Sequence, residues 1–143
     1  MTSIYLPDSV ATEYYGANLA KQLPNKCLIF LTGDLGSGKT TLVRGFLRAL
    51  GYNNTVKSPT YTLVEEYPLK RGLVCHFDLY RVQDPEELEL IGIRDYLSQQ
   101  AICFIEWPER GLNTLPEPDI HINLVQEGQG RRLFCLGLED EKK

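Results

Sequence analysis

The sequence predicts an α/β fold, in which helices flank a mixed β-sheet on both faces to give three α/β/α layers. Three adjacent features indicate this fold. Residues 26–32 (Lys-Cys-Leu-Ile-Phe-Leu-Thr) form a short, nearly continuous apolar segment, which is typical of a parallel strand covered on both faces. A glycine-rich turn follows directly, and apolar residues at helical spacing begin after Lys39. We therefore expect a strand, a turn and a helix at the centre of the fold.

One helix is expected before this strand along the chain, and one after it. The second begins at Lys39, and Gly51 is placed to end it. Its expected core-facing residues are Leu42, Val43, Phe46, Leu47 and Leu50. The first follows a short strand near residues 3–6 and is opened by Asp8. Its expected core-facing residues are Val10, Tyr14, Ala17 and Ala20.

The middle of the chain predicts a hairpin, a helix and a further strand. Residues 62–68 and 73–79 are joined by a connection short enough for an antiparallel hairpin, which makes the sheet mixed. Asp84 and Pro85, followed by two glutamates, are typical of a helix start. Residues 101–106 form another apolar strand that ends in an acid.

The end of the chain predicts a second hairpin, from residues 120–125 and 131–138, with a turn at 127–130 that contains two glycines. The four cysteines lie singly within apolar runs, so we expect buried free thiols and no zinc or redox motif. They are Cys27, Cys75, Cys103 and Cys135.

Composition and charge limit the classes of function. Apolar residues make up 43% and charged residues 24% of the chain, which is the balance of a soluble globular protein. No apolar run is long enough to span a bilayer and no secretion signal is recognisable, so we expect a cytoplasmic protein without a membrane partner. The net charge of −4 disfavours direct binding of a nucleic-acid backbone, so any nucleic acid is expected to be held by another protein.

Residues 33–40 (Gly-Asp-Leu-Gly-Ser-Gly-Lys-Thr) match the phosphate-loop pattern G-x-x-x-x-G-K-[ST] in full. The expected strand before it and helix after it are the context that the pattern requires. Glycines let backbone N–H groups wrap phosphate oxygens at the positive end of a helix. We therefore predict one P-loop NTPase-like domain at residues 1–138 that binds ATP or ADP with Mg²⁺, followed by a frayed tail at 139–143.

Each residue type in the loop has an expected role. Lys39 supplies a positive charge between the outer phosphates, and the Thr40 hydroxyl is one magnesium ligand. Thr41 is expected to contact an inner phosphate. The other loop residues expected to bind nucleotide are Asp34, Gly36, Ser37 and Gly38.

Magnesium in such a site also needs a carboxylate at the end of a neighbouring strand, and two acids end apolar runs, Asp78 and Glu106. Glu106 fits the metal role better because four apolar residues precede it. Asp78 is expected to orient a water or to hold a loop. The expected catalytic residues are therefore Lys39, Asp78 and Glu106. The alternative for either carboxylate is a strand-end acid that faces solvent or caps a turn.

Three residues outside the loop are further candidates for nucleotide contact. Thr60, within Ser-Pro-Thr-Tyr-Thr, stands where many nucleotide switches carry a threonine that senses the terminal phosphate, and a plain turn is the alternative. Trp107 is a candidate for packing near the nucleotide, or for a core or interface anchor. Arg131, like Arg132, could reach the nucleotide from the last hairpin. The default interpretation of either residue is an exposed arginine without such a contact.

The two histidines, His76 and His121, alternate with apolar neighbours on expected strands, and neither is assigned a role as ligand or base.

Several blocks of the sequence, taken together, resemble the TsaE (YjeE) family over nearly the whole chain. They are residues 33–41 (Gly-Asp-Leu-Gly-Ser-Gly-Lys-Thr-Thr), 58–65 (Ser-Pro-Thr-Tyr-Thr-Leu-Val-Glu), 76–81 (His-Phe-Asp-Leu-Tyr-Arg), 84–89 (Asp-Pro-Glu-Glu-Leu-Glu), 92–96 (Gly-Ile-Arg-Asp-Tyr) and 106–108 (Glu-Trp-Pro). The resemblance implies that Trp107 lies close to the nucleotide. It also implies roles in binding nucleotide and magnesium for Lys39, Thr40, Thr41, Asp78 and Glu106.

The resemblance further implies a small bacterial ATPase that helps to make threonylcarbamoyladenosine beside the anticodon of tRNA. It implies an accessory partner of TsaD, which transfers the threonylcarbamoyl group, and of TsaB. ATP binding and hydrolysis, weak alone and stimulated by these proteins, would reset the complex between turnovers. Contact with tRNA would then be indirect, through the complex.

Two other functions remain open on the residues alone. A small-molecule kinase with the same P-loop would need an acceptor pocket and usually a lid with several arginines, and no segment of the sequence has the pattern of such a lid. A nucleotide-dependent interaction module with negligible hydrolysis would differ from the ATPase only in rate.

Overall fold

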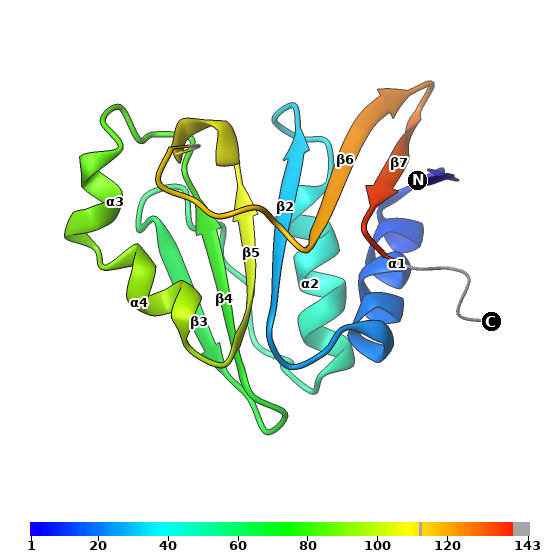
Figure 1. Cartoon of the computed structure of the whole chain (residues 1–143). Helices are drawn as coiled ribbons and strands as arrows, with labels where there is room; N and C mark the ends of the chain where they lie inside the picture. Colours follow the sequence, from blue (N-terminus) through cyan, green and yellow to red (C-terminus); the bar gives the residue numbers. More distant parts are fainter. Residues whose placement is uncertain (112, 139–143) are drawn as a thin grey trace.

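One mixed sheet of seven strands runs through the residues that the computed structural model describes, 1–111 and 113–138 (Figure 1). The strands are β1 (Thr2–Leu6), β2 (Cys27–Gly33), β3 (Val64–Pro68), β4 (Leu73–Asp78), β5 (Ala101–Glu106), β6 (Ile120–Glu127) and β7 (Gly130–Leu136). Their order across the sheet is β1-β7-β6-β2-β5-β4-β3. The pairs β2–β5, β2–β6 and β4–β5 are parallel, whereas β1–β7, β3–β4 and β6–β7 are antiparallel. The predicted mixed sheet and both predicted hairpins are confirmed.

Helices cover both faces of the sheet. They are α1 (Ser9–Gln22), α2 (Lys39–Ala49), α3 (Glu86–Leu90) and α4 (Ile93–Ser98), with a short 3₁₀ helix η1 (Pro108–Gly111). Ile29 of β2 packs in a core with α1 and α2, whereas its neighbour Phe30 packs in a second core with α3 and α4. Because successive strand residues point to opposite faces, β2 is covered on both sides, and the predicted α/β/α layering is confirmed.

The predicted ends of the two longer helices are confirmed. The Asp8 carboxylate accepts a hydrogen bond from the Ala11 N–H, 2.9 Å away, and so caps α1. Gly51 follows α2 with φ of 97°, and its N–H donates to the Arg48 carbonyl at 3.1 Å. The helix after Asp84 begins at Glu86, one residue later than expected, and Asp84 Oδ1 accepts from the Glu86 N–H.

The prediction for the core-facing side of α1 was wrong for Val10 and Tyr14 and is confirmed for Ala20. Val10 and Tyr14 are exposed at 77% and 68%, and Ala17 is half-buried. The buried residues of α1 are Thr12, Gly16, Leu19 and Ala20. Thr12, Gly16 and Ala20 are small, and α1 lies closest to α2 at Gly16, where a larger side chain has no room.

Two glycines allow this close approach. A Cβ on Gly16 would lie 2.1 Å from the Leu42 carbonyl oxygen, and a Cβ on Gly45 would lie 2.1 Å from the Glu13 carbonyl oxygen. An ion pair between Arg44 Nε and Glu13 Oε2, 3.0 Å apart, lies beside this contact. Backbone contact therefore fixes α2, and with it the loop that leads into α2.

Gly45→Ala should destabilise the fold by about 1–3 kcal/mol, because the new methyl group forces the two helices apart. Helix propensity alone predicts the opposite sign, a gain of about 0.5–1 kcal/mol. Urea unfolding measures the difference, with Ala49→Ser on the exposed side of the same helix as a control expected to change stability by less than about 0.5 kcal/mol. A more stable Gly45→Ala variant would contradict the close contact.

Three further expectations have different outcomes. All four cysteines are buried and free, as predicted. Within residues 1–111 and 113–138, every helix is too short or too polar to cross a bilayer. Residues 139–143, predicted as a tail, lie outside the described residues, so the boundary at residue 138 stays a prediction.

The strand register brings three carboxyl ends together. Leu31 of β2, two residues before the end of its strand, pairs with Glu106 at the end of β5, and Glu106 pairs with Asp78 at the end of β4. Open α/β sheets bind ligands at the carboxyl ends of their parallel strands, so this edge is where a site is expected.

Candidate functional site

The glycine-rich loop joins β2 to α2 at this edge. Gly38 precedes α2 with φ of 110°, a left-handed conformation that other residues rarely adopt. A Cβ on Gly33 would lie 2.5 Å from the Leu124 carbonyl oxygen of β6. No side chain of the described residues caps the start of α2, so its first N–H groups stay available at the positive end of the helix dipole. Such an end is suited to bind an anion.

A cavity of about 290 Å³ lies beside the loop. It brings together most of the residues predicted from the sequence. Its lining residues are Ser9, Leu35, Gly36, Gly38, Lys39, Thr40, Thr41, Ser58, Thr60, Asp78, Glu106 and Arg131. Three predicted residues, Asp34, Ser37 and Trp107, lie next to it without lining it. Ser9, Leu35 and Ser58 line the cavity but were not predicted as site residues, although Leu35 lies within the loop and Ser9 directly follows the helix-capping Asp8.

Lys39 is held within the loop by backbone groups. Its side chain is only 5% exposed, and Nζ donates to the carbonyls of Gly33 and Asp34. Nζ also lies 4.6 Å from the centre of the Trp107 ring, so the tryptophan contacts the lysine directly. Burial lowers the pKa of Lys39, while the carboxylates of Glu106 and Asp78 partly oppose that change.

The lowered pKa of Lys39 predicts a pH dependence. Neutral lysine appears below the ordinary pKa of 10.5, whereas a bound phosphate favours the charged form. ADP affinity should therefore fall as the pH rises toward 10.5, with proton uptake on binding. Folding stability should instead rise over the same pH range, because Lys39 binds its proton more tightly in the unfolded chain than in the folded one.

Calorimetry of ADP binding in buffers of different ionisation enthalpy measures this proton uptake. Lys39→Ala is the control and should remove the pH dependence of whatever weak binding remains. A wild-type affinity that stays constant up to the ordinary lysine range would contradict a charge-dependent role for Lys39.

Glu106 lies at the centre of a buried polar group. Its carboxylate is 4% exposed, and Oε2 accepts a hydrogen bond from Thr40 Oγ1 at 3.2 Å. His76 Nε2 lies 2.6 Å from the same oxygen, and the His76 side chain is fully buried. The predicted pair Thr40 and Glu106 is thus adjacent. His76 was missed, although a period of two along β4 places it on the same face as Asp78.

Asp78 connects the segment around Thr60 to the sheet. Asp78 Oδ2 accepts from Thr60 Oγ1 at 3.0 Å, and Oδ1 accepts from the Tyr80 N–H at 2.9 Å. Ser58 Oγ lies 2.8 Å from Thr60 Oγ1. Thr60 therefore lies in the polar wall of the cavity, and its role toward a terminal phosphate stays a prediction.

Arg131 extends from β7 to the loop. Its Nη1 lies 2.7 Å from where a Cβ on Gly38 would stand, and it donates to Thr12 Oγ1 at 3.3 Å. Arg131 is half-buried, unlike the exposed arginine taken as the default. Arg132 does not line the cavity and instead pairs with Glu127 at 2.9 Å.

Three buried side-chain polar atoms lack a hydrogen-bond partner among the described residues. They are Ser37 Oγ, His76 Nδ1 and Arg131 Nε. Buried polar groups normally have partners, so each of these atoms calls for an explanation. The Ser37 hydroxyl and the Arg131 guanidinium are donors beside the buried Lys39 charge. This donor set is suited to a phosphate group.

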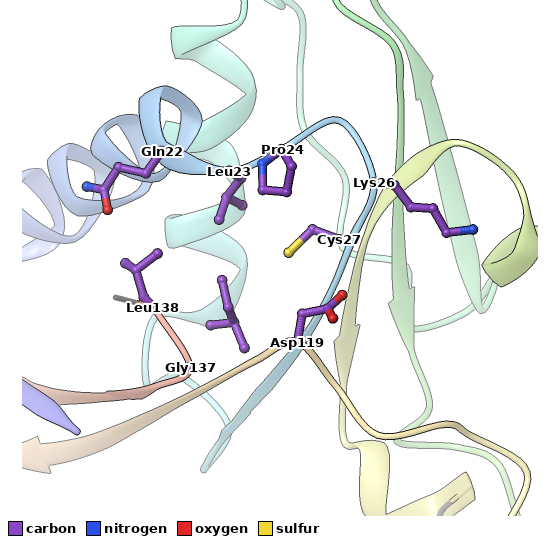
Figure 2. A pocket seen from close by; sticks show the side chains of 9 residues that line it. Gln22, Leu23, Pro24, Lys26, Cys27, Asp119, Gly137 and Leu138 are labelled. Atoms are coloured by element: carbon purple, nitrogen blue, oxygen red, sulfur yellow. The ribbon is translucent and has the colours of Figure 1, made fainter. Parts of the chain in front are cut away.

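A larger cavity, of about 590 Å³, lies at the opposite end of β2. Figure 2 shows Leu23, Pro24 and Cys27 on one side of it and Asp119 and Leu138 on the other. Burial, and then the nearby Asp119 charge, raise the pKa of Cys27 to about 12. The thiol stays protonated at neutral pH and is a poor nucleophile. Size alone therefore does not identify the site.

The fold and the loop define the class of protein. A buried parallel strand leads through a glycine-rich loop into a helix, and acids end the next two strands of the sheet. This is an α/β protein with a P-loop-like fold.

The chain belongs to the TsaE family, because the family model described as "Threonylcarbamoyl adenosine biosynthesis protein TsaE" matches residues 6–134. The chain is 50% identical over 137 residues to the Haemophilus influenzae tRNA threonylcarbamoyladenosine biosynthesis protein TsaE, covering 92% of this chain and 87% of the relative. A Synechocystis protein of the same name is 43% identical over 110 residues, covering 74% and 69%.

A solved structure has the same fold. The crystal structure of Bacillus subtilis YdiB matches with a TM-score of 0.77 and 26% identity, covering 92% of this chain and 82% of that chain. The resemblance predicted from the sequence blocks is confirmed at the level of the family and of the fold.

Proposed function

We propose that this protein is a small ATPase that binds ATP with Mg²⁺ and acts as an accessory partner of the TsaD–TsaB complex in threonylcarbamoyl modification of tRNA. Hydrolysis resets that complex between turnovers and is weak without it. The observation that carries the proposal is the gathering of Lys39, Thr40 and Glu106 around a complete phosphate loop in a chain of the TsaE family.

The loop supplies the donors for the phosphates. The first residues of α2 line the cavity of about 290 Å³, and among the described residues no side chain caps their N–H groups, which suits them to bind a phosphate. On binding, Lys39 exchanges the carbonyls of Gly33 and Asp34 for oxygens of the outer phosphates. Arg131, which lines the cavity and whose Nε has no partner among the described residues, is a further donor for the phosphates. Charge-assisted hydrogen bonds of this kind are the strongest available to the protein.

The residues around Thr40 would hold magnesium. Thr40 Oγ1 and the Glu106 carboxylate are adjacent, and one or two such oxygens together with phosphate oxygens are typical Mg²⁺ ligands. The ion, when bound, neutralises charge on the outer phosphates. Asp78 orients the attacking water or keeps Thr60 at the cavity, since its carboxylate contacts the Thr60 hydroxyl.

The partners follow from the family and the charge. The TsaE relatives are named for tRNA threonylcarbamoyladenosine biosynthesis. A net charge of −4 disfavours direct binding of this chain to tRNA. We therefore infer that TsaD and TsaB hold the tRNA and that this protein contacts it only through them. Work on tRNA also argues for a cytoplasmic location.

An assay with purified components tests the proposal. ATP hydrolysis by the chain alone should be slow and should rise when TsaB and TsaD are added, and Lys39→Ala should abolish the increase. Phosphate transferred to a metabolite hydroxyl would instead support the kinase alternative. Hydrolysis that is absent with and without the partners would contradict the ATPase.

A further inference from the structure

His76 is an unusual residue for a sheet interior. It lies on β4, fully buried, on the same face as Val74 and Asp78 and beside Phe104 of β5. Its Nδ1 is buried without a partner among the described residues. An apolar side chain would leave no orphaned acceptor at this place in the core, so packing alone does not explain a histidine.

The contact with Glu106 explains a histidine at this position. An ionised carboxylate only accepts hydrogen bonds, so at a distance of 2.6 Å His76 Nε2 carries the hydrogen and donates it to Glu106 Oε2. Glu65, which pairs with His76 across β3 and β4, accepts instead from the Thr62 hydroxyl through its own Oε2. Glu106 is therefore the carboxylate that His76 serves.

Both hydrogen bonds that the Glu106 carboxylate receives from described residues reach the same oxygen. Thr40 Oγ1 and His76 Nε2 contact Oε2, which leaves Oε1 for another ligand. If Thr40 binds magnesium, its hydroxyl oxygen turns to the ion, and His76 remains as the donor that fixes the plane of the carboxylate. Partners of this kind set the orientation of a metal ligand.

We propose that His76 is a positioning residue that holds Glu106 through Oε2 so that Oε1 faces the magnesium shell. This inference rests on the proposed function, because it assumes that Glu106 serves a nucleotide-bound metal. His76 itself contacts neither metal nor nucleotide.

Two similar substitutions separate this role from packing. The amide nitrogen of glutamine reaches the place of Nε2, whereas the shorter asparagine ends near the place of Nδ1. His76→Asn should weaken Mg²⁺ binding to the ADP complex by about tenfold or more, the usual effect of removing such a partner. His76→Gln should restore it to within about threefold of wild type.

Trp107 fluorescence, the signal of the single tryptophan beside Lys39, follows the magnesium titration at saturating ADP. ADP affinity without magnesium should be equal in all three proteins. Wild-type magnesium affinity in a folded His76→Asn variant that still binds ADP overturns the role of His76 alone. Absence of any ADP binding by the wild type overturns the proposed function, and this inference with it.

Nitrogen NMR of the wild-type histidines tests the contact even if His76→Asn does not fold. The sequence has two histidines, and His121→Asn assigns the spectrum, because His121 contacts Thr32 away from the cavity. We expect hydrogen on Nε2 of His76, none on Nδ1, and a shift of the Nε2 signal in Glu106→Gln. Hydrogen on Nδ1 alone would overturn the proposal.

Discussion

Lys39→Ala should abolish tight ATP binding, with a loss of affinity of at least about 100-fold, or about 2.8 kcal/mol. The ammonium group is a buried positive charge that the phosphate loop holds, and hydrogen bonds to charged groups contribute about 1.5–3 kcal/mol each. Calorimetric titration with Mg–ATP measures the change.

Lys26→Ala is the matched control for this loss. Lys26 stands just before the start of β2 and, like Lys39, donates to backbone carbonyls, in this case those of Leu97, Ser98 and Gln99. Lys26→Ala removes the same charge from the other end of the same strand. The variant should bind ATP with an affinity within about twofold of wild type, since an exposed charge that far away is screened. Equal affinity in Lys39→Ala and wild type would count against the loop as the nucleotide site.

Glu106→Gln should lower magnesium-dependent turnover at least tenfold, which is about 1.4 kcal/mol of barrier. Glutamine keeps the size of the side chain and can still contact Thr40, but it lacks the negative charge that favours magnesium. The measurement is ATP turnover with the partner proteins as a function of magnesium concentration.

Asp78→Asn and Glu117→Gln complete this series. Glu117 is an exposed acid that does not line the cavity beside the loop, so Glu117→Gln should have wild-type turnover. If Asp78 orients water, Asp78→Asn should lower turnover without changing the magnesium requirement. Wild-type turnover in Glu106→Gln, together with a changed magnesium requirement in Asp78→Asn, would move the metal role to Asp78.

Local patterns in the sequence were sufficient for most of the fold. The apolar segment at 101–106 has the same bounds as β5, because a strand buried on both faces needs continuous apolar residues. Asp8 and Gly51 marked helix ends through chemistry that acts within a few residues.

Features set by distant contacts were not predictable in this way. The inner face of α1 is lined by small residues such as Gly16, and that choice makes sense only once α2 is known to touch it. Arg71, expected simply to lie in a hairpin turn, donates to the carbonyls of Ala20 and Leu23 at the end of α1. Neither contact leaves a periodic signal in the sequence.

The same division applies to the candidate site. Lys39 and Thr40 follow from a contiguous motif, and Glu106 follows from the end of an apolar run. His76 requires the register of β4 against β5, which the sequence does not contain. Arg131 reaches the loop only because β7 lies beside β6, two strands from β2.

Isothermal calorimetry of the folded wild-type protein with Mg–ATP and Mg–ADP tests the central claim most directly, because the phosphate loop either gathers a nucleotide or does not. We predict saturable heat with both nucleotides, alone or in the presence of TsaB and TsaD, and no such heat for Lys39→Ala. No heat with any magnesium nucleotide, with or without those partners, would contradict the account.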